Sequence, residues 1–152
     1  MMAEGWPDLA GRIEAGEHVL PVRVYYEDTD FSGFVYHANY LKFCERARSD
    51  CLRLLGIHHH ELHWHESDGR MGFVVRRMQC DFLKPARIDD VLEVRTAMLT
   101  IKGARFELDQ RVSRDGELLF HGLVMAALVD GAGKPKRMPK AIQLALDKLI
   151  SG

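Results

Sequence analysis

The sequence is short of cysteine, of net charge and of long apolar runs, and each shortage excludes a class of protein. The 152 residues include three cysteines, Cys44, Cys51 and Cys80, whose odd number and wide spacing argue against a disulfide framework. A formal net charge of −1 provides no basic surface of the kind that general nucleic-acid binding requires. The longest apolar run, residues 118–129, is shorter than the roughly 20 residues of a membrane-spanning helix. We therefore expect a reduced, cytoplasmic protein with no nucleic-acid partner and no transmembrane segment.

The length is that of one domain with a real hydrophobic core. Residues 1–17 read as an N-terminal extension, and they lack the basic and then apolar order of a secretory signal. Residues 18–152 read as a single domain, because no repeat, linker or low-complexity segment divides them.

Hydrophobic periodicity predicts one long helix and several strands. Residues 22–26 alternate as a first strand, and apolar residues then recur at three- and four-residue steps from His37 to a stop at Gly56. Further strands are predicted over residues 73–82, 91–101, 104–112 and 118–129, with a tight hairpin at 115–116. A short helix is predicted over residues 138–150. One strand, a long helix and four antiparallel strands make an α+β fold, whose uncovered sheet face or edge favours a dimer or tetramer.

Between the first strand and the long helix lies an acidic turn that contains glycine. Asp30 stands in this turn, and His37 opens the helix, where the first backbone amides have no intrahelical acceptor. A carboxylate can attack a carbonyl or activate water, and amide donors at a helix start can stabilise an oxyanion. The junction therefore predicts an acyl-transfer site.

The same stretch resembles a known family. The matching residues are Asp28, Thr29, Asp30, Gly33, Val35, Tyr36, His37, Tyr40, Glu45, Arg46, Ala47 and Arg48, followed by Pro85, Ala86, Arg87, Asp90, Leu92, Glu93 and Val94. These residues resemble the signature of the 4-hydroxybenzoyl-CoA thioesterase-like hotdog family, most closely its bacterial members associated with the Tol-Pal system. The resemblance implies a five-stranded antiparallel sheet wrapped around one central helix, assembled as a homodimer or homotetramer.

The resemblance also implies an activity and roles for individual residues. It implies hydrolysis of acyl-CoA thioesters, or of acyl carrier protein thioesters, without a cofactor. Asp30 is then the nucleophile or general base, and the backbone amide of His37 polarises the thioester carbonyl. The sequence leaves open both the choice between the two routes and whether the His37 imidazole orients a reacting group or only packs.

Further residues are candidates for substrate binding. Gly33 lets the backbone approach the substrate, and Tyr36 and Tyr40 either line an acyl pocket or belong to the core. The cations Lys134, Lys136 and Arg137 suit the phosphates of coenzyme A or an acidic carrier protein, and a solvated turn is the other interpretation.

Other acidic and basic residues are given lesser roles. Asp28 is interpreted as structural, Glu45 is a reserve carboxylate, and Glu45 and Arg48 are spaced for an ion pair on the helix surface or at a subunit contact. Arg76 shares a predicted strand face with apolar residues and is expected to reach a sheet edge, a neighbouring subunit or the substrate. The histidine-rich residues 58–65 lack the His-Glu-x-x-His spacing of a zinc site, so we expect no functional metal.

Two alternatives share the predicted fold. Enoyl-thioester hydratases also pair Asp with His, but the expected spacing is five residues, and Asp30 and His37 are seven apart. A non-catalytic acyl-CoA sensor would need a DNA-binding module, which the sequence lacks. For a Tol-Pal associated enzyme, the resemblance also allows peripheral association with the inner membrane.

Overall fold

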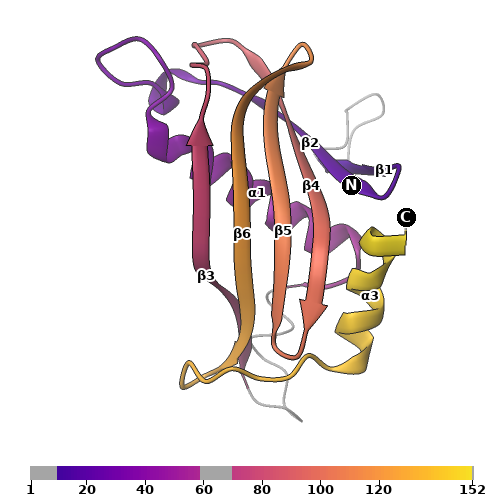
Figure 1. Ribbon diagram of the computed structural model, residues 1–152. Coiled ribbons are helices and arrows are strands. Elements are labelled where there is room, and N and C mark those ends of the chain that lie inside the picture. Colours follow the sequence, from indigo (N-terminus) through magenta and orange to yellow (C-terminus); the bar gives the residue numbers. More distant parts are fainter. Residues whose placement is uncertain (1–9, 59–69, 152) are drawn as a thin grey trace, which may run out of the picture.

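The computed structural model describes residues 10–58 and 70–151, apart from the side chains of the last two. A six-stranded antiparallel sheet lies against one long helix (Figure 1). The strands are β1 (Arg12–Glu14), β2 (Glu17–Arg23), β3 (Met71–Phe82), β4 (Val91–Lys102), β5 (Arg105–Arg114) and β6 (Glu117–Asp130). The helices are α1 (His37–Leu54) and α3 (Lys140–Ser151), and a single 3-10 turn, η1, spans Tyr26–Asp28.

The strand order across the sheet is β1-β2-β4-β5-β6-β3. β6 is an interior strand between β5 and β3, and β3 forms one edge. α1 crosses one face of the sheet, while α3 packs beside β4 (Figure 1). The α+β class, the antiparallel sheet and the long helix are therefore confirmed.

The predicted count of five strands was wrong by one. β1 lies within the predicted N-terminal extension, and it pairs with β2 from Arg12 opposite Val19 to Glu14 opposite Glu17. Gly11, just before β1, donates its amide to the Asp50 carboxylate of α1 at 2.8 Å. These contacts tie residues 11–14 to the sheet and to the long helix.

The first predicted strand was also misplaced. β2 ends at Arg23, and Tyr26 belongs to η1 rather than to a strand. By contrast, the helix begins at His37 and ends just before Gly56, whose φ of +84° is the left-handed conformation expected at a helix C-terminus. The hairpin at Asp115 and Gly116 has positive φ at both residues, as a two-residue turn requires.

Two apolar clusters fill the space between the sheet and the helices. One surrounds the first half of α1 and includes Phe43, Leu92, Val112 and Phe120. The other lies under the second half of α1 and includes side chains from α3. Among the described residues, no helix is long and apolar enough to cross a membrane.

Candidate active site

A polar turn joins β2 to α1, and Asp28 holds it together. The Asp28 side chain is buried, and its carboxylate accepts hydrogen bonds from the Tyr25 amide and from the Asn39 side chain, both at 2.9 Å. The Tyr36 amide donates to the Asp28 carbonyl at 2.8 Å. Asp28 therefore fixes the end of the strand to the start of the helix, which is the structural role predicted for it.

Asp30 begins a tight turn two residues further on. Its amide donates to the Phe34 carbonyl, and its carbonyl accepts from the Gly33 amide, each at 3.0 Å. Gly33 has a φ of +87°, and no atom lies within 4 Å of the position that a Cβ would take there. Glycine is thus needed for the backbone conformation, and it leaves open space above the turn.

The Asp30 carboxylate is exposed and ionised. It accepts hydrogen bonds from the amide of Ser32, at 2.8 Å, and from the hydroxyl of the same residue. These two bonds, the hydroxyl first, lower the pKa of Asp30 below its usual value, and charge on His37 lowers it further. Ser32 was not predicted as a site residue, although serine two residues after aspartate is a common turn signature.

The start of α1 lies close to this turn. Tyr36 occupies the position before the helix and provides no side-chain hydrogen bond to the first amides. Those donors therefore lack the cap that serine, threonine or aspartate usually supplies. The partial positive charge of the helix end and the Asp30 carboxylate are both available at this surface.

The two sequence segments that carry the family resemblance meet at this site. The Val35 amide donates to the Ala86 carbonyl at 2.8 Å, and Phe34 pairs with Arg87 in an isolated bridge. The Arg87 guanidinium also lies over the Phe34 ring, 5.1 Å from its centroid. The segment between β3 and β4 thus supports the turn from behind.

The two candidate tyrosines occupy different environments. Tyr40 is buried and stacks on Phe120 with ring centroids 5.3 Å apart, and its hydroxyl accepts from the Ala86 amide at 3.0 Å. Burial raises the pKa of Tyr40. Tyr36 is exposed beside His37, whose ring also contacts the edge of Phe82 on β3. Tyr40 is therefore a core residue in this chain, whereas Tyr36 lies at the surface of the site.

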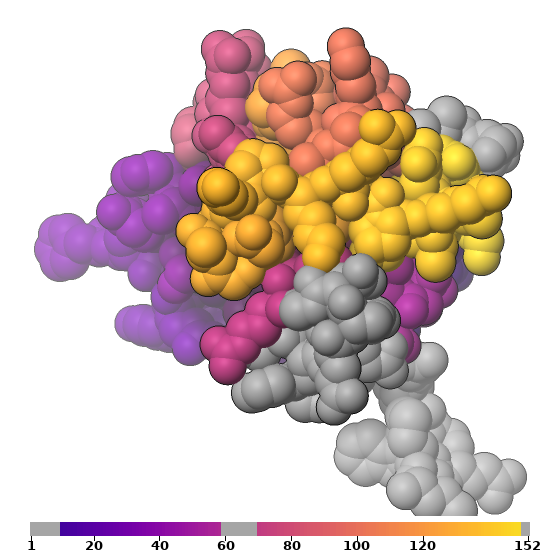
Figure 2. Space-filling model, turned by 90° about the horizontal axis from the view of Figure 1, so that it is seen from below, coloured from indigo at the N-terminus to yellow at the C-terminus, as the bar shows by residue number. Residues whose placement is uncertain are grey.

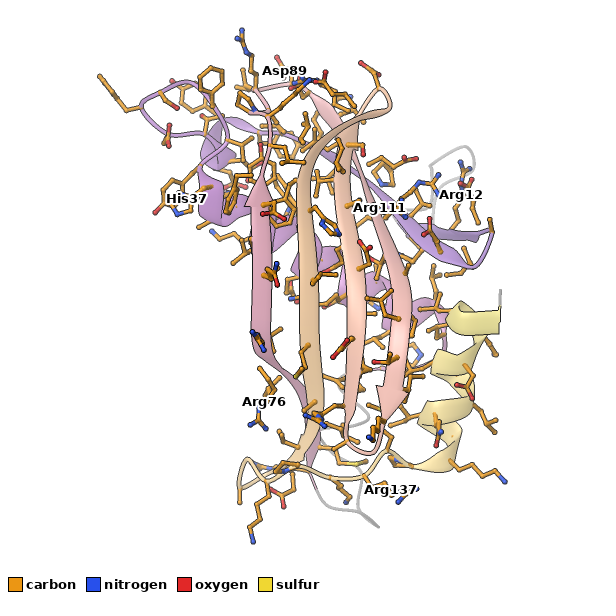
Figure 3. All side chains as sticks on the ribbon, in the orientation of Figure 1. Arg12, His37, Arg76, Asp89, Arg111 and Arg137 are labelled. Carbon is orange, nitrogen blue, oxygen red and sulfur yellow. The ribbon has the colours of Figure 1, made fainter. Side chains whose placement is uncertain are left out.

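The predicted phosphate-binding cations lie elsewhere in the chain. Lys134, Lys136 and Arg137 follow β6, at the end of the sheet opposite His37 (Figures 1 and 3). Figure 2 views this lower end, where the orange and yellow segment after β6 lies in front. The turn is ordered by Asp130, whose carboxylate accepts from the amides of Ala132 and Lys134.

Within the described part of this chain, Glu45 and Arg48 do not form the helix-surface ion pair that was one of the two arrangements expected for them. Arg48 donates to the Gln110 side chain at 2.8 Å, and Gln110 in turn donates to Thr96 and to a helix carbonyl. Glu45 instead accepts a hydrogen bond from Ser49. The buried polar residues of β4 and β5 attract the guanidinium because they would otherwise lack partners.

The predicted strand face of Arg76 was also wrong. A β-bulge separates Val75 from Arg77, so Arg76 is the extra residue of the bulge and has no paired residue on β6. Because a bulge shifts the alternation by one residue, Arg76 no longer shares a face with Met78 and Cys80. Its side chain extends from the free edge of β3 in Figure 3.

The remaining candidates for chemistry are inert or lie outside the described residues. Burial raises the pKa of Cys44 and of Cys51 to about 12, and it also raises the pKa of Cys80. Of the histidine-rich segment only His58 is described, and residues 59–65 lie outside the described part. Within residues 10–58 and 70–151, no group of three possible metal ligands occurs.

Known thioesterases resemble this chain in sequence and in fold. The family model described as Thioesterase superfamily matches residues 32–121. Acyl-CoA thioester hydrolase YbgC of Escherichia coli O157:H7 is 44% identical over 124 residues, which cover 80% of this chain and 90% of that protein. Acyl-CoA thioesterase YbgC of Haemophilus influenzae is 42% identical over 131 residues, which cover 86% of this chain and 94% of that protein. The crystal structure of a probable thioesterase from Bartonella henselae superimposes with a TM-score of 0.78 at 41% identity. The superposition covers 81% of this chain and 99% of that one.

Proposed function

The chain belongs to the thioesterase superfamily, and on this premise we propose that it hydrolyses acyl-CoA thioesters at the turn between β2 and α1. One observation carries the proposal: the turn that leads into the uncapped start of a long helix holds an exposed carboxylate, Asp30, whose pKa is lowered. The activity of the YbgC relatives supports acyl-CoA as the substrate class. The reaction as proposed uses neither a metal nor a bound cofactor.

The start of α1 binds the thioester carbonyl. The carbonyl oxygen accepts a hydrogen bond from the His37 amide, which has no intrahelical acceptor of its own. As the oxygen gains charge, the helix end stabilises it, and one such donor is typically worth about 3–4 kcal/mol. The open space above Gly33 admits the thioester, and Tyr36 lies at the surface beside it.

Asp30 supplies the attacking group. One carboxylate oxygen bonds to the carbonyl carbon, the carbon–sulfur bond breaks, and coenzyme A leaves as a thiolate that takes a proton from water. Water then hydrolyses the mixed anhydride, releasing the fatty acid and restoring Asp30. A carboxylate with a lowered pKa stays ionised near neutral pH, which both direct attack and activation of water require, and direct attack is the route written here. The His37 ring packs against the edge of Phe82, and charge on the ring lowers the pKa of Asp30.

A second copy of the chain would enclose this open site. β3 is an edge strand of twelve residues, and apolar side chains on and after it are exposed, including Val75, Phe82 and Leu83. Phe31 in the catalytic turn is also fully exposed. Long edges with apolar side chains are rarely left open to water. We therefore place a homodimer interface at β3 and allow a homotetramer built from two such dimers.

This assembly explains how the distant cations could reach the substrate. If β3 pairs antiparallel with its copy, the lower end of one sheet lies beside the upper end of the other. Lys134, Lys136 and Arg137 of the second copy would then approach the coenzyme A phosphates. A neighbouring open pocket of about 510 Å³ is lined by further cations, Arg76, Lys102 and Arg105. Arginine and lysine are the usual partners of phosphate groups.

The family resemblance extends the proposal to the setting of the enzyme. From it we propose a cytoplasmic enzyme with peripheral association at the inner membrane, and acyl carrier protein as a second thioester carrier. The basic lower end of the sheet would face an acidic carrier or an anionic surface.

Purified protein assayed with acyl-CoA and with enoyl-CoA substrates tests the proposal. We expect release of free thiol from acyl-CoA and no hydration of the enoyl double bond. Light scattering should give twice or four times the mass of the chain. Hydration without thiol release would replace the proposed reaction, and a stable monomer with full activity would remove the role of the second copy.

A further inference from the structure

A cavity of about 150 Å³ lies beneath the second half of α1, away from the reacting groups. Its walls are mainly apolar and come from α1, the sheet and α3, and they include Leu52, Met98, Phe106, Leu108, Ala126 and Leu149. Protein interiors contain few voids larger than a water molecule. An apolar cavity of this size in another protein, lined by leucine, isoleucine and phenylalanine, stays dry and binds benzene. The cavity therefore suits a hydrocarbon group.

The cavity opens at the free edge of the sheet. Its exposed lining residues are Glu45 on α1 and Val74 and Val75 on β3, so the mouth lies between the helix and the edge strand. The β-bulge at Arg76 follows immediately, and bulges redirect neighbouring side chains. Arg48 also lines the cavity, and its guanidinium donates to the buried side chain of Gln110.

α1 begins beside the upper end of β3, and we call the apolar packing from there toward the mouth the seam. At the upper end of the seam, His37 contacts Phe82. Between the ends, Leu41 of α1 and Met78 of β3 are partly buried and pack against the same apolar cluster. Glu45 at the mouth is eight residues after His37, which corresponds to roughly 12 Å along a helix.

We infer that this cavity holds the distal end of the acyl chain and so sets the longest chain that the enzyme accepts. The inference rests on the proposed hydrolysis of acyl-CoA. A flexible aliphatic chain follows the seam from the carbonyl, and its last carbons enter the cavity. A benzene-sized space accommodates about six carbons. The substrate class is therefore a medium or long aliphatic acyl group, whereas acetyl and butyryl groups end before the mouth.

Filling or enlarging the cavity tests this inference. Ala126→Leu adds three carbons inside the cavity, and Leu149→Ala removes three from its wall. Ala141→Leu makes the same addition as the first variant on the exposed side of α3 and serves as the control. For each protein, kcat/KM is measured with saturated acyl-CoA thioesters from acetyl to palmitoyl.

We expect Ala126→Leu to lower kcat/KM for the longest accepted chains by about ten-fold or more, while butyryl-CoA and the control variant change by less than about two-fold. Leu149→Ala should shift the optimum toward longer chains, so the inference stays testable if the first variant fails to fold. If kcat/KM depends on chain length in the same way for all folded variants and the wild type, the role of the cavity is overturned and the proposed hydrolysis still stands. A wild-type protein that hydrolyses no acyl-CoA would instead overturn the proposed function.

Discussion

The Asp28 carboxylate holds the catalytic turn against α1, and removing it should cost a measurable part of the folding free energy. It accepts from a backbone amide and from the Asn39 side chain, and both the carboxylate and Asn39 are buried. Asp28→Ala leaves both donors without an acceptor. A buried donor without a partner costs about 1–3 kcal/mol, and because the Tyr25 amide is only partly buried, the two losses together should cost about 3 kcal/mol. Asp28→Asn retains one acceptor oxygen and should cost about half as much.

Denaturant unfolding at a fixed protomer concentration measures this loss. Glu27→Ala is the matched control, because Glu27 is the exposed neighbouring carboxylate, and it should change the free energy of unfolding by less than about 0.5 kcal/mol. A cycle with Asn39→Ala should show that the effects of the two substitutions are not additive, since they break the same bond. A loss below about 1 kcal/mol for Asp28→Ala would refute the reasoning.

Three further predictions follow from the contacts of the described residues. Ser32→Ala should raise the pKa of Asp30 toward its usual value, so that on acidification kcat/KM falls at a higher pH than in the wild type; an unshifted profile would contradict this. Gly11→Ala should lower the melting temperature, because a Cβ there would lie 2.3 Å from the Val19 carbonyl oxygen; an unchanged melting curve would show that β1 adjusts freely. Replacing Lys134, Lys136 and Arg137 together by alanine should raise KM for acyl-CoA by about ten-fold or more, because charge-assisted hydrogen bonds are worth about 1.5–3 kcal/mol. The same replacement should leave KM unchanged for an acyl-pantetheine, which lacks the nucleotide phosphates. Equal effects on both substrates would exclude phosphate binding by these residues.

Local patterns in the sequence predicted the elements that local interactions create. The helix from His37 follows from apolar periodicity, and its end follows from a glycine with positive φ. The hairpin at Asp115 and Gly116 follows from turn chemistry. The position of Asp30 in the turn just before the helix could also be predicted, because both belong to one short segment.

Features that depend on distant partners could not be predicted. β1 is only three residues long and forms because it pairs with β2. Its own sequence has no pattern that predicts a strand. Tyr26 continued an alternation, but the capture of the Tyr25 amide by Asp28 turns the chain into η1. The bulge at Arg76 and the bond between Arg48 and Gln110 have no local signature. The support of Val35 by Ala86 likewise joins segments fifty residues apart in a way that no periodicity encodes.

The most direct test of the central claim is a single-turnover measurement on Asp30→Asn, with Asp115→Asn, an exposed turn aspartate, as the control. The asparagine oxygen can still accept from Ser32, so the turn should keep its shape. We expect the rate of thiol release to fall by about 10²–10⁴-fold while the affinity for acyl-CoA stays within about two-fold of the wild type. Thiol release at the wild-type rate would show that another group attacks the thioester.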